Sequence, residues 1–365
     1  MRDTPKIKNG ADSVHLSLFE YFTQLCVTFQ DRLTYAKVGN SYKKVDMSAS
    51  KIAVYATNEL GPANIDRVSD ATKKAGWTTI TLGLFHVGYP PKWAEADIFF
   101  NDPPPIVHNG SYRADPAWPE KIAQLKQNSP VTQIYASIGG GDPVEDFSTI
   151  KTIYEKNNNS FDRTMLKKNL QVFRKTFPAI DGIDMDCEES YDQPSFVAFC
   201  KMVIGMGFAI TFCPFERTKF WVGSLKELEE SNNERSNKGA VKYKGVVKWW
   251  NLQCYAGGSG NDPKRWANAI KKQIPKFSTA GFILASDWAR FYDEDDGVWL
   301  GDCPAAVKQL ISGYSKEACF GGAFIWNMDA IIKTERDPRL QCCGKASMAD
   351  YAQAIRETMQ PVAPS

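Results

Sequence analysis

The stretch DGIDMDCEES, residues 181–190, alternates acidic with apolar side chains. Because successive side chains of a β-strand point to opposite faces, a strand here would place Asp184, Asp186 and Glu188 on one face. Its other face would carry the apolar residues Ile183, Met185 and Cys187. Burying three carboxyl groups without partners is costly, and their mutual repulsion raises the pKa of at least one. A general acid that works near neutral pH needs such a raised pKa, so the stretch predicts a catalytic strand.

Two other interpretations of this stretch fit less well. A solvated acidic strand is disfavoured because the preceding segment FPAI, residues 177–180, and the apolar residues between the carboxylates indicate burial. A calcium-binding loop of the EF-hand type needs Gly at its sixth position and Glu at its twelfth. Counted from Asp184, these positions hold Glu189 and Ser195.

The acidic strand is one of eight short β-rich runs between residues 51 and 329. Charged segments of helical character lie between them, several of which open with Asp, Ser or Pro. This alternation predicts an α/β protein, a (β/α)₈ TIM barrel. The expected strands are residues 51–57, 78–85, 132–140, 180–188, 208–215, 246–255, 280–288 and 321–329. The clearest helical segments are residues 64–76, 161–178, 194–207, 262–277 and 304–314.

Functional residues of such a barrel gather at the carboxyl ends of its strands. Asp186 and Glu188 fall at this end of the fourth expected strand. Two long connections, residues 88–118 and 215–245, are rich in aromatic residues, and we expect them to overhang the same face. They could form a binding cleft or simply pack as lids.

The first 47 residues precede the barrel, which we expect to span residues 48–365. Apolar side chains recur at helical spacing through residues 14–29, which predicts an amphipathic helix in an N-terminal extension. These residues are Leu18, Phe19, Phe22, Leu25, Cys26 and Phe29. The helix would pack against the main body or, alternatively, bind a protein partner.

Composition excludes several classes of partner. The chain has 365 residues with 43% hydrophobic content and a net charge of +2. With so little net positive charge, we do not expect it to bind nucleic acid or an acidic membrane surface. The N-terminus lacks the apolar core of a signal peptide, because Glu20 and Gln24 interrupt it. No run of 18 apolar residues predicts a transmembrane helix. We therefore expect a cytoplasmic protein or one that is secreted by a non-classical route.

The nine cysteines include no CxxC pair, and Cys187, Cys213 and Cys254 lie inside expected strands. Buried free thiols in a reducing compartment explain this pattern better than a disulfide framework or a zinc site. The three histidines, at positions 15, 86 and 108, are scattered over unrelated elements. We therefore expect neither a His-based triad, nor a metal, nor another cofactor.

The acidic stretch resembles a known signature. DGIDMDCE, residues 181–188, is similar to the Asp-Gly-x-Asp-x-Asp-x-Glu signature of glycoside hydrolase family 18. That family comprises (β/α)₈ barrels, among them chitinases, endo-β-N-acetylglucosaminidases and inactive chitinase-like lectins. Three more segments resemble it in the expected strand order, namely SIGG at 137–140, LQCY at 252–255 and GGAFIWNMD at 321–329. The resemblance covers about residues 51–333.

The resemblance implies a catalytic role for each carboxylate. Glu188 would protonate the glycosidic oxygen and then, as a base, activate water. Asp186 would orient the 2-acetamido group of the substrate, whose carbonyl oxygen is the nucleophile in this family. Asp184 would hold a proton or exchange it with Asp186.

The resemblance also implies residues that contact the sugar. Tyr255 would hydrogen-bond the acetamido oxygen, and Trp326 would form an apolar floor beneath the sugar. Gln253 is a further substrate-binding candidate, although Gln253 and Tyr255 could instead be polar core residues and Trp326 barrel core. Tyr55 on the first strand could also enter the pocket.

Two departures from the family pattern bear on the substrate. Many chitinases of the family read Trp-Glu-Tyr-Pro where residues 187–190 here read Cys-Glu-Glu-Ser, and Ala256 stands where Asp or Asn is common. The catalytic residues are nevertheless all present. We expect a retaining hydrolase of β-1,4-linked N-acetylglucosamine polymers. The alternatives are an endo-β-N-acetylglucosaminidase that cleaves N-glycan cores and a lectin or assembly subunit without turnover.

Overall fold

The structure is a computed structural model that describes residues 33–38, 41–46, 50–88, 96–141, 145–231, 234–236, 239–241, 243–337, 339 and 346–359. The chain divides into two compact units, and the larger one spans Lys51–Gln360. In the smaller unit, strands β1 (Leu33–Val38) and β2 (Ser41–Asp46) pair antiparallel. The helix expected at residues 14–29 lies outside the described residues. The boundary between residues 47 and 48 stays a prediction.

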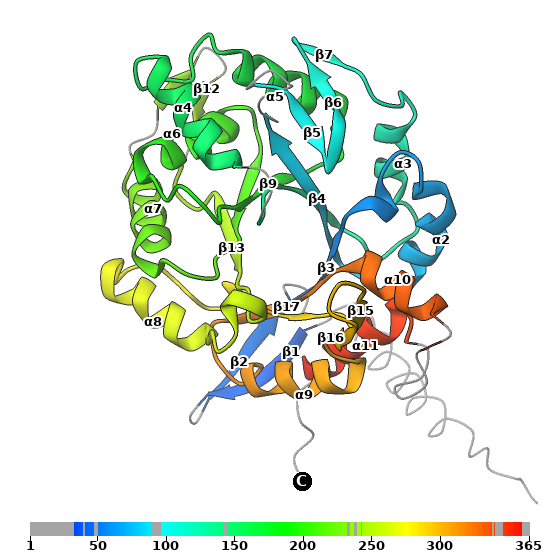
Figure 1. Ribbon diagram of the computed structural model, residues 1–365. Helices are drawn as coiled ribbons and strands as arrows, with labels where there is room; N and C mark the ends of the chain where they lie inside the picture. The colour runs from blue at the N-terminus through cyan, green and yellow to red at the C-terminus, as the bar shows by residue number, and fades with distance from the viewer. Residues whose placement is uncertain are drawn as a thin grey trace, which may run out of the picture. The chain divides into compact units, whose positions relative to one another are not determined.

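Eight parallel strands close into a barrel in the larger unit (Figure 1). Each strand pairs with the next in chain order, and β17 pairs with β3 to complete the ring. All eight expected strands are confirmed. They are β3 (Lys51–Ala56), β4 (Thr79–Val87), β8 (Gln133–Gly139), β9 (Gly182–Asp186), β10 (Ala209–Phe212), β13 (Val247–Asn251), β14 (Ile283–Trp288) and β17 (Phe320–Trp326).

The barrel strands are buried on both faces, which is why their sequences are almost continuously apolar. Outward-facing residues such as Ile183 and Met185 of β9 join the large core between the strands and the helices. A separate, smaller cluster fills the barrel interior, and it consists of Ala53, Tyr55, Tyr135, Cys213, Trp249, Leu284 and Phe324. Polar side chains buried inside the barrel need hydrogen-bond partners, which neighbouring side chains can supply.

Helices surround the barrel on its outside (Figure 1). The five expected helical segments are confirmed as α2 (Ile65–Ala75), α5 (Met165–Thr176), α6 (Gln193–Gly205), α8 (Pro263–Gln273) and α9 (Pro304–Tyr314). The described part of the chain contains five more helices, α3 (Trp118–Gln124), α4 (Asp146–Lys156), α7 (Thr218–Glu230), α10 (Met328–Arg336) and α11 (Met348–Thr358). None of the described helices is long and apolar enough to cross a lipid bilayer.

The connection at residues 215–245 is not the single long loop that the sequence predicts. Its first part is α7, which packs between α6 and α8 on the outside of the barrel. Four apolar side chains explain this position, because Phe220, Trp221, Leu225 and Leu228 are buried on one side of the helix. Two short strands follow, β11 (Glu234–Ser236) and β12 (Gly239–Val241), and they form an antiparallel pair.

The connection at residues 88–118 also contains strands where the sequence predicts a loop. β5 (Ile98–Phe100), β6 (Asp102–His108) and β7 (Ser111–Tyr112) extend the sheet antiparallel from the end of β4. The aromatic residues Phe99, Phe100 and Trp118 are buried, so they belong to the core and line no cleft. Residues 89–95 lie outside the described residues.

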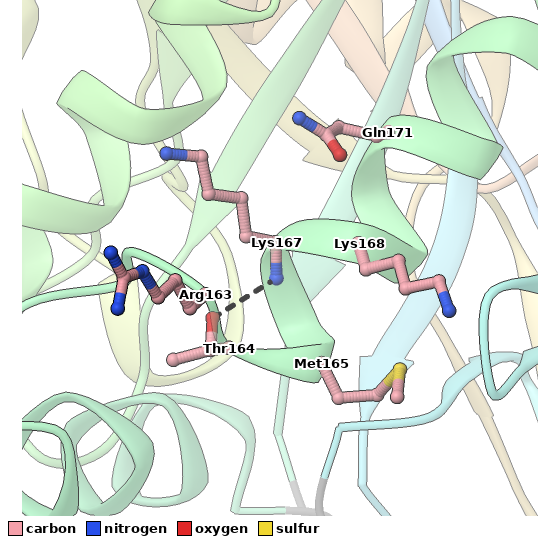
Figure 2. Close-up of a pocket in the computed structure, with 6 residues that line it drawn as sticks. All are labelled: Arg163, Thr164, Met165, Lys167, Lys168 and Gln171. Atoms are coloured by element: carbon pink, nitrogen blue, oxygen red, sulfur yellow. Dashed lines mark hydrogen bonds between the residues drawn. The ribbon is translucent and has the colours of Figure 1, made fainter.

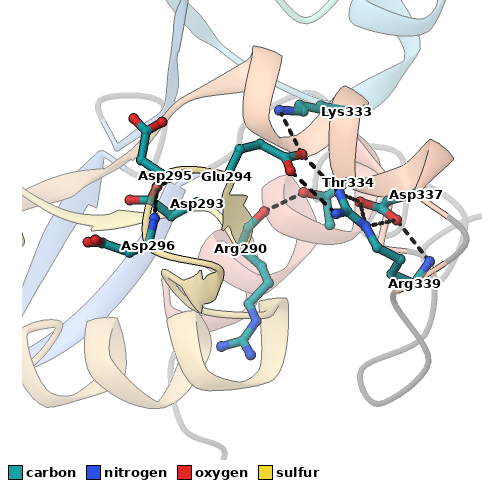
Figure 3. Close-up of polar contacts among 9 residues, drawn as sticks. All are labelled: Arg290, Asp293, Glu294, Asp295, Asp296, Lys333, Thr334, Asp337 and Arg339. Carbon is teal, nitrogen blue, oxygen red and sulfur yellow. Dashed lines mark hydrogen bonds and ion pairs between the residues drawn. The ribbon is translucent and has the colours of Figure 1, made fainter.

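A hairpin that the sequence does not predict follows β14. It consists of β15 (Phe291–Asp293) and β16 (Val298–Leu300), and polar contacts fasten it to α10 and Arg339 (Figure 3). The Thr334 hydroxyl donates to the carbonyl oxygen of Arg290 at 2.7 Å. Arg339 bridges Glu294 at 3.0 Å and Asp337 at 2.6 Å. Because the Arg339–Glu294 pair is exposed, solvent screens it and it contributes little stability, whereas the Asp337 carboxyl group is buried.

Candidate active site

Asp184 lies buried inside the barrel and accepts four hydrogen bonds. Tyr55 Oη and Ser137 Oγ donate to its Oδ2 at 2.7 and 2.9 Å. Thr211 Oγ1 and Asn251 Nδ2 donate to its Oδ1 at 2.6 and 2.9 Å. The donors come from β3, β8, β10 and β13, so barrel closure assembles the site. Burial raises the pKa of Asp184 even though the four hydrogen bonds favour its charged form.

Asp186 and Glu188 lie next to each other at the carboxyl end of β9. Gln253 Nε2 donates to Asp186 Oδ1 at 3.2 Å and to Glu188 Oε1 at 3.0 Å, so one amide bridges both carboxyl groups. Burial raises the pKa of Asp186 well above its usual value, and the charges of Glu188 and Asp184 add to the effect. Burial also raises the pKa of Glu188. Asp186 is 3% exposed, whereas Glu188 is half-buried and can reach solvent.

The thiol of Cys213 is a third neighbour of Asp186. Tyr55 Oη lies 3.3 Å from its Sγ and Gln253 Nε2 lies 3.6 Å from it. A hydrogen bond between Cys213 and Asp186 lowers the pKa of that carboxyl. Burial raises the pKa of the thiol well above its usual value, so Cys213 stays protonated and can donate.

The SIGG segment allows β8 to approach Asp186 closely. A Cβ atom on Gly139 would lie 2.1 Å from the Asp186 carbonyl oxygen, and the residue has a φ of +107°. The amide of Gly140 donates to the same oxygen at 2.8 Å. Only glycine combines this backbone conformation with this approach. The segment therefore fixes the backbone of Asp186, while its Ser137 reaches Asp184.

The expected sugar-contacting residues occupy different depths. Tyr255 is partly exposed, and its ring centroid lies 5.4 Å from that of Trp288. Trp326, at the end of β17, is also partly exposed and lies 5.4 Å from the Tyr55 ring. Tyr55 is only 1% exposed and donates to Asp184, so it lies in the barrel interior beneath the carboxyl groups. Their roles toward a sugar stay predictions.

Sequence reasoning missed Cys213, Thr211, Asn251 and Trp288. The signal was present for three of them, because inward-facing positions alternate along a strand. Thr211 and Cys213 alternate with Ile210 and Phe212. Asn251 continues the series to Gln253 and Tyr255 in the same way. The position of Trp288 depends on the turn after β14, which the sequence does not define.

Two features elsewhere bear on what the site holds. Among the described residues, no three His, Cys, Asp or Glu side chains are placed to hold a metal ion. The six cysteines in the described ranges are free thiols, namely Cys187, Cys200, Cys213, Cys254, Cys303 and Cys319. The groups that the described part of the site offers to a ligand are thus carboxyl, amide, hydroxyl, thiol and aromatic side chains.

A shallow surface hollow of about 300 Å³ lies at the start of α5 (Figure 2). Its lining comprises Arg163, Thr164, Met165, Lys167, Lys168 and Gln171, none of which belongs to the carboxylate site. Thr164 Oγ1 accepts a hydrogen bond from the Lys167 amide at 3.2 Å and caps the helix. The Lys167 ammonium pairs with Asp162. These contacts explain the local arrangement as a helix start.

Comparisons with known proteins bear on the fold. No protein-family model matches the sequence, and no curated protein matches it. Solved structures do. A chitinase from Bacillus thuringiensis is 12% identical, with a TM-score of 0.53 over 87% of this chain and 71% of that one. An immunomodulatory active chitinase from Trichuris suis is 14% identical, with a TM-score of 0.50 over 84% and 100% of the two chains.

A third similar structure carries ligands. Catalytic-site mutants of active domain 2 of a thermostable chitinase from Pyrococcus furiosus, complexed with chito-oligosaccharides, are 11% identical to this chain. Their TM-score is 0.52 over 86% of this chain and 97% of that one. At these identities the likeness concerns the fold alone. The fold of this protein is similar to that of these chitinases, as the sequence resemblance predicts.

Proposed function

We propose that this protein is a retaining glycoside hydrolase that cleaves β-1,4-linked N-acetylglucosamine polymers with assistance from the substrate's 2-acetamido group. The observation that supports this most is the arrangement of three carboxyl groups at one end of β9. Asp184 is saturated by four donors, and Gln253 bridges Asp186 and Glu188 above it. The arrangement lies toward the carboxyl end of a barrel strand, and TIM-barrel enzymes carry their active sites at that end, which supports the proposal.

Glu188 is the general acid in this proposal. Burial raises its pKa, so the carboxyl group keeps its proton to higher pH than an exposed glutamate does, and its partial exposure lets a substrate oxygen reach it. It protonates the glycosidic oxygen while the acetamido carbonyl oxygen attacks the anomeric carbon from the other face. The leaving sugar departs with that proton, and Glu188 is left ionised. It then removes a proton from the water that opens the oxazolinium intermediate, so the anomeric configuration is retained.

Asp186 orients the nucleophile of the first step. Its carboxyl group accepts a hydrogen bond from the acetamido N–H, which aims the carbonyl oxygen and offsets the positive charge that develops on the ring. Asp184 lies one inward position before it on β9 and accepts only hydrogen bonds from neutral donors. A single proton shared between Asp184 and Asp186 limits the repulsion among the three carboxyl groups as Glu188 loses and regains its proton.

Aromatic side chains hold the sugar over the carboxyl groups. Trp326 forms the apolar floor beneath the sugar, and the Tyr255 hydroxyl donates a hydrogen bond to the acetamido oxygen. Both are partly exposed at the carboxyl end of the barrel. Trp288 packs against Tyr255 and fixes the orientation of its ring. Apolar faces that contact a sugar and a few directed polar groups are the usual composition of such a site.

Hydrolysis of fluorogenic di- and tri-N-acetylchitooligosaccharides by the wild type and by Glu188→Gln, between pH 4 and 8, tests the proposal. We expect turnover by the wild type and its loss in the variant. A wild type that ignores these substrates but removes N-glycans from a high-mannose glycoprotein would be an endo-β-N-acetylglucosaminidase. If neither protein hydrolyses these substrates but both still bind the sugar, the protein is a lectin.

A further inference from the structure

Glu189, the residue after the proposed acid, is tied to a different element of the barrel. Its Oε1 accepts a hydrogen bond at 2.5 Å from the backbone amide of Phe147, in the first turn of α4. Its Oε2 is buried and has no hydrogen-bond partner among the residues that the structure describes. The segment that follows β9 is therefore fastened to the helix that follows β8.

Helix α4 depends on this contact at its start. The first amides of a helix have no partner within the helix and need an acceptor from elsewhere. The residue at the capping position, Glu145, makes no side-chain capping hydrogen bond within the described part of the chain. Glu189 supplies an acceptor from a distant part of the sequence.

The same turn of α4 is held from the other side by β4. Asp146 is fully buried, and its Oδ1 accepts from the Val87 amide at 2.5 Å. Its Oδ2 lies 2.9 Å from Nδ1 of His86. The start of α4 is thus fixed to the end of β4, and Glu189 fixes the segment after β9 to the start of α4. Three neighbouring barrel segments share this connection.

The backbone that follows Glu188 is also held by a local contact. The Cys187 thiol donates to the Glu189 carbonyl oxygen at 3.0 Å. Ser190, the next residue, has a φ of +45°, so the chain turns sharply here. The side chain of Glu189 ties this local arrangement to α4, and Gln253 ties the Glu188 carboxyl group to the segment after β13. Without the Glu189 side chain, the segment that carries Glu188 keeps its turn but loses its attachment to α4.

We propose that Glu189 is a positioning residue for Glu188, an inference that rests on the proposed hydrolase function. Glu189 touches no reacting atom in this proposal. It sets the place of the acid relative to Asp186, whose backbone is fixed separately by Gly140. An error of about 1 Å in the position of a catalytic group can reduce a rate by about 100-fold.

Three substitutions at this position separate positioning from charge. Glu189→Ala removes the acceptor, and we expect kcat for tri-N-acetylchitotriose hydrolysis to fall by about 10- to 100-fold while KM changes less than about threefold. Glu189→Asp keeps the charge but is shorter by one methylene, so we expect a similar fall. Glu189→Gln keeps an acceptor oxygen for the Phe147 amide, and we expect its kcat to stay within about threefold of the wild type.

A matched helix-cap variant controls for simple loss of stability. Thr164 caps α5 through the Lys167 amide and lies outside the carboxylate site. We expect Thr164→Ala to lower the midpoint of thermal unfolding as Glu189→Ala does, with no fall in kcat. Circular dichroism and kcat per folded molecule are measured on all four variants at one temperature below every transition.

The outcomes distinguish the inference from the function on which it rests. An active wild type and a Glu189→Ala variant with unchanged kcat would overturn the positioning role alone. Equal falls in kcat for Thr164→Ala and Glu189→Ala would also overturn it, because general destabilisation would then explain both. A wild type without hydrolytic activity would overturn the proposed function and the positioning role together.

Discussion

Two acidic segments of this protein are similar in composition and opposite in environment. The signature on β9 holds Asp184, Asp186 and Glu188 within five residues, and the turn between β15 and β16 holds the consecutive residues 293–296, Asp-Glu-Asp-Asp. On β9 the pKa of each of the three carboxyl groups is raised, with burial as the largest cause. In the turn, the hydrogen bond from Arg339 lowers the pKa of Glu294.

The difference shows that spacing decides what a group of carboxylates can do. Alternate residues on a buried strand must share one interior, where charge is costly and protons are held. In the exposed turn Arg339 pairs with Glu294 and favours the ionised form of that carboxyl group, whose pKa is lowered. Burial in the first environment raises the pKa of the carboxyl groups, so they hold their protons to higher pH, and four predictions test this comparison.

The largest expected effect is on turnover. We expect Glu188→Gln to lower kcat by about 1,000-fold or more, because a general acid contributes about that much and an amide cannot replace it. Glu294→Gln is the matched change in the exposed turn, and we expect it to leave kcat unchanged. Both variants are assayed on the same fluorogenic chitooligosaccharide, and comparable losses in the two would remove the distinction between the segments.

The second effect is on stability. In Asp184→Asn, the amide NH₂ group replaces one carboxylate oxygen and so meets two of the four donors that now bond to Asp184. At least one buried donor then loses its acceptor, and we expect the free energy of unfolding to fall by about 2–3 kcal/mol. Urea denaturation followed by tryptophan fluorescence measures this change. In Glu294→Gln the same measurement should detect no difference, and a larger loss there than in Asp184→Asn would contradict the comparison.

The barrel could be predicted from the sequence because each strand is a distinct apolar run and helical segments separate the runs. The sequence was sufficient for the carboxyl groups because the signature is local. It failed for α7, where charges at positions 226, 227, 229 and 230 obscure the apolar spacing of Trp221, Leu225 and Leu228. It also failed for β5–β7, whose place depends on the length of β4 beyond the barrel.

The donors to Asp184 mark the limit of prediction at the site. Thr211 and Asn251 can be assigned to the inward face of their strands by alternation. Their height relative to Asp184 depends on the stagger between neighbouring strands, which closing the barrel determines. The link from Glu189 to α4 was likewise out of reach, because it joins residues 42 positions apart through a helix that the sequence did not predict.

The third effect concerns pH. Burial raises the pKa of Glu189 to about 7, above its value in an unfolded chain. The folded state therefore holds this proton more tightly than the unfolded state does, so stability is fully present below the unfolded pKa and is lost as pH rises through about 7. After allowance for partial exposure, we expect Glu189 to account for about 2 kcal/mol of lost stability between pH 5 and 8.

Urea unfolding of the wild type and of Glu189→Gln across this pH range checks that contribution. The variant has no titrating group at this position, so its stability should fall less steeply with pH. Glu294→Gln, in the exposed turn, should follow the wild-type curve. Parallel curves for the wild type and Glu189→Gln would show that the Glu189 proton is bound equally in both states.

The smallest expected effect sharpens the comparison within the buried segment itself. The Cys213 thiol hydrogen-bonds Asp186 and lowers the pKa of that carboxyl, opposing the effect of burial. In Cys213→Ala this donor is lost, so the pKa of Asp186 rises and the acidic limb of the kcat profile should move by about half a pH unit to higher pH. Cys213→Ser keeps a donor, and its acidic limb should return to the wild-type position or below it. An unchanged profile in Cys213→Ala would mean that burial and the neighbouring carboxylates alone set the protonation of Asp186. Cys213 would then contribute only by packing.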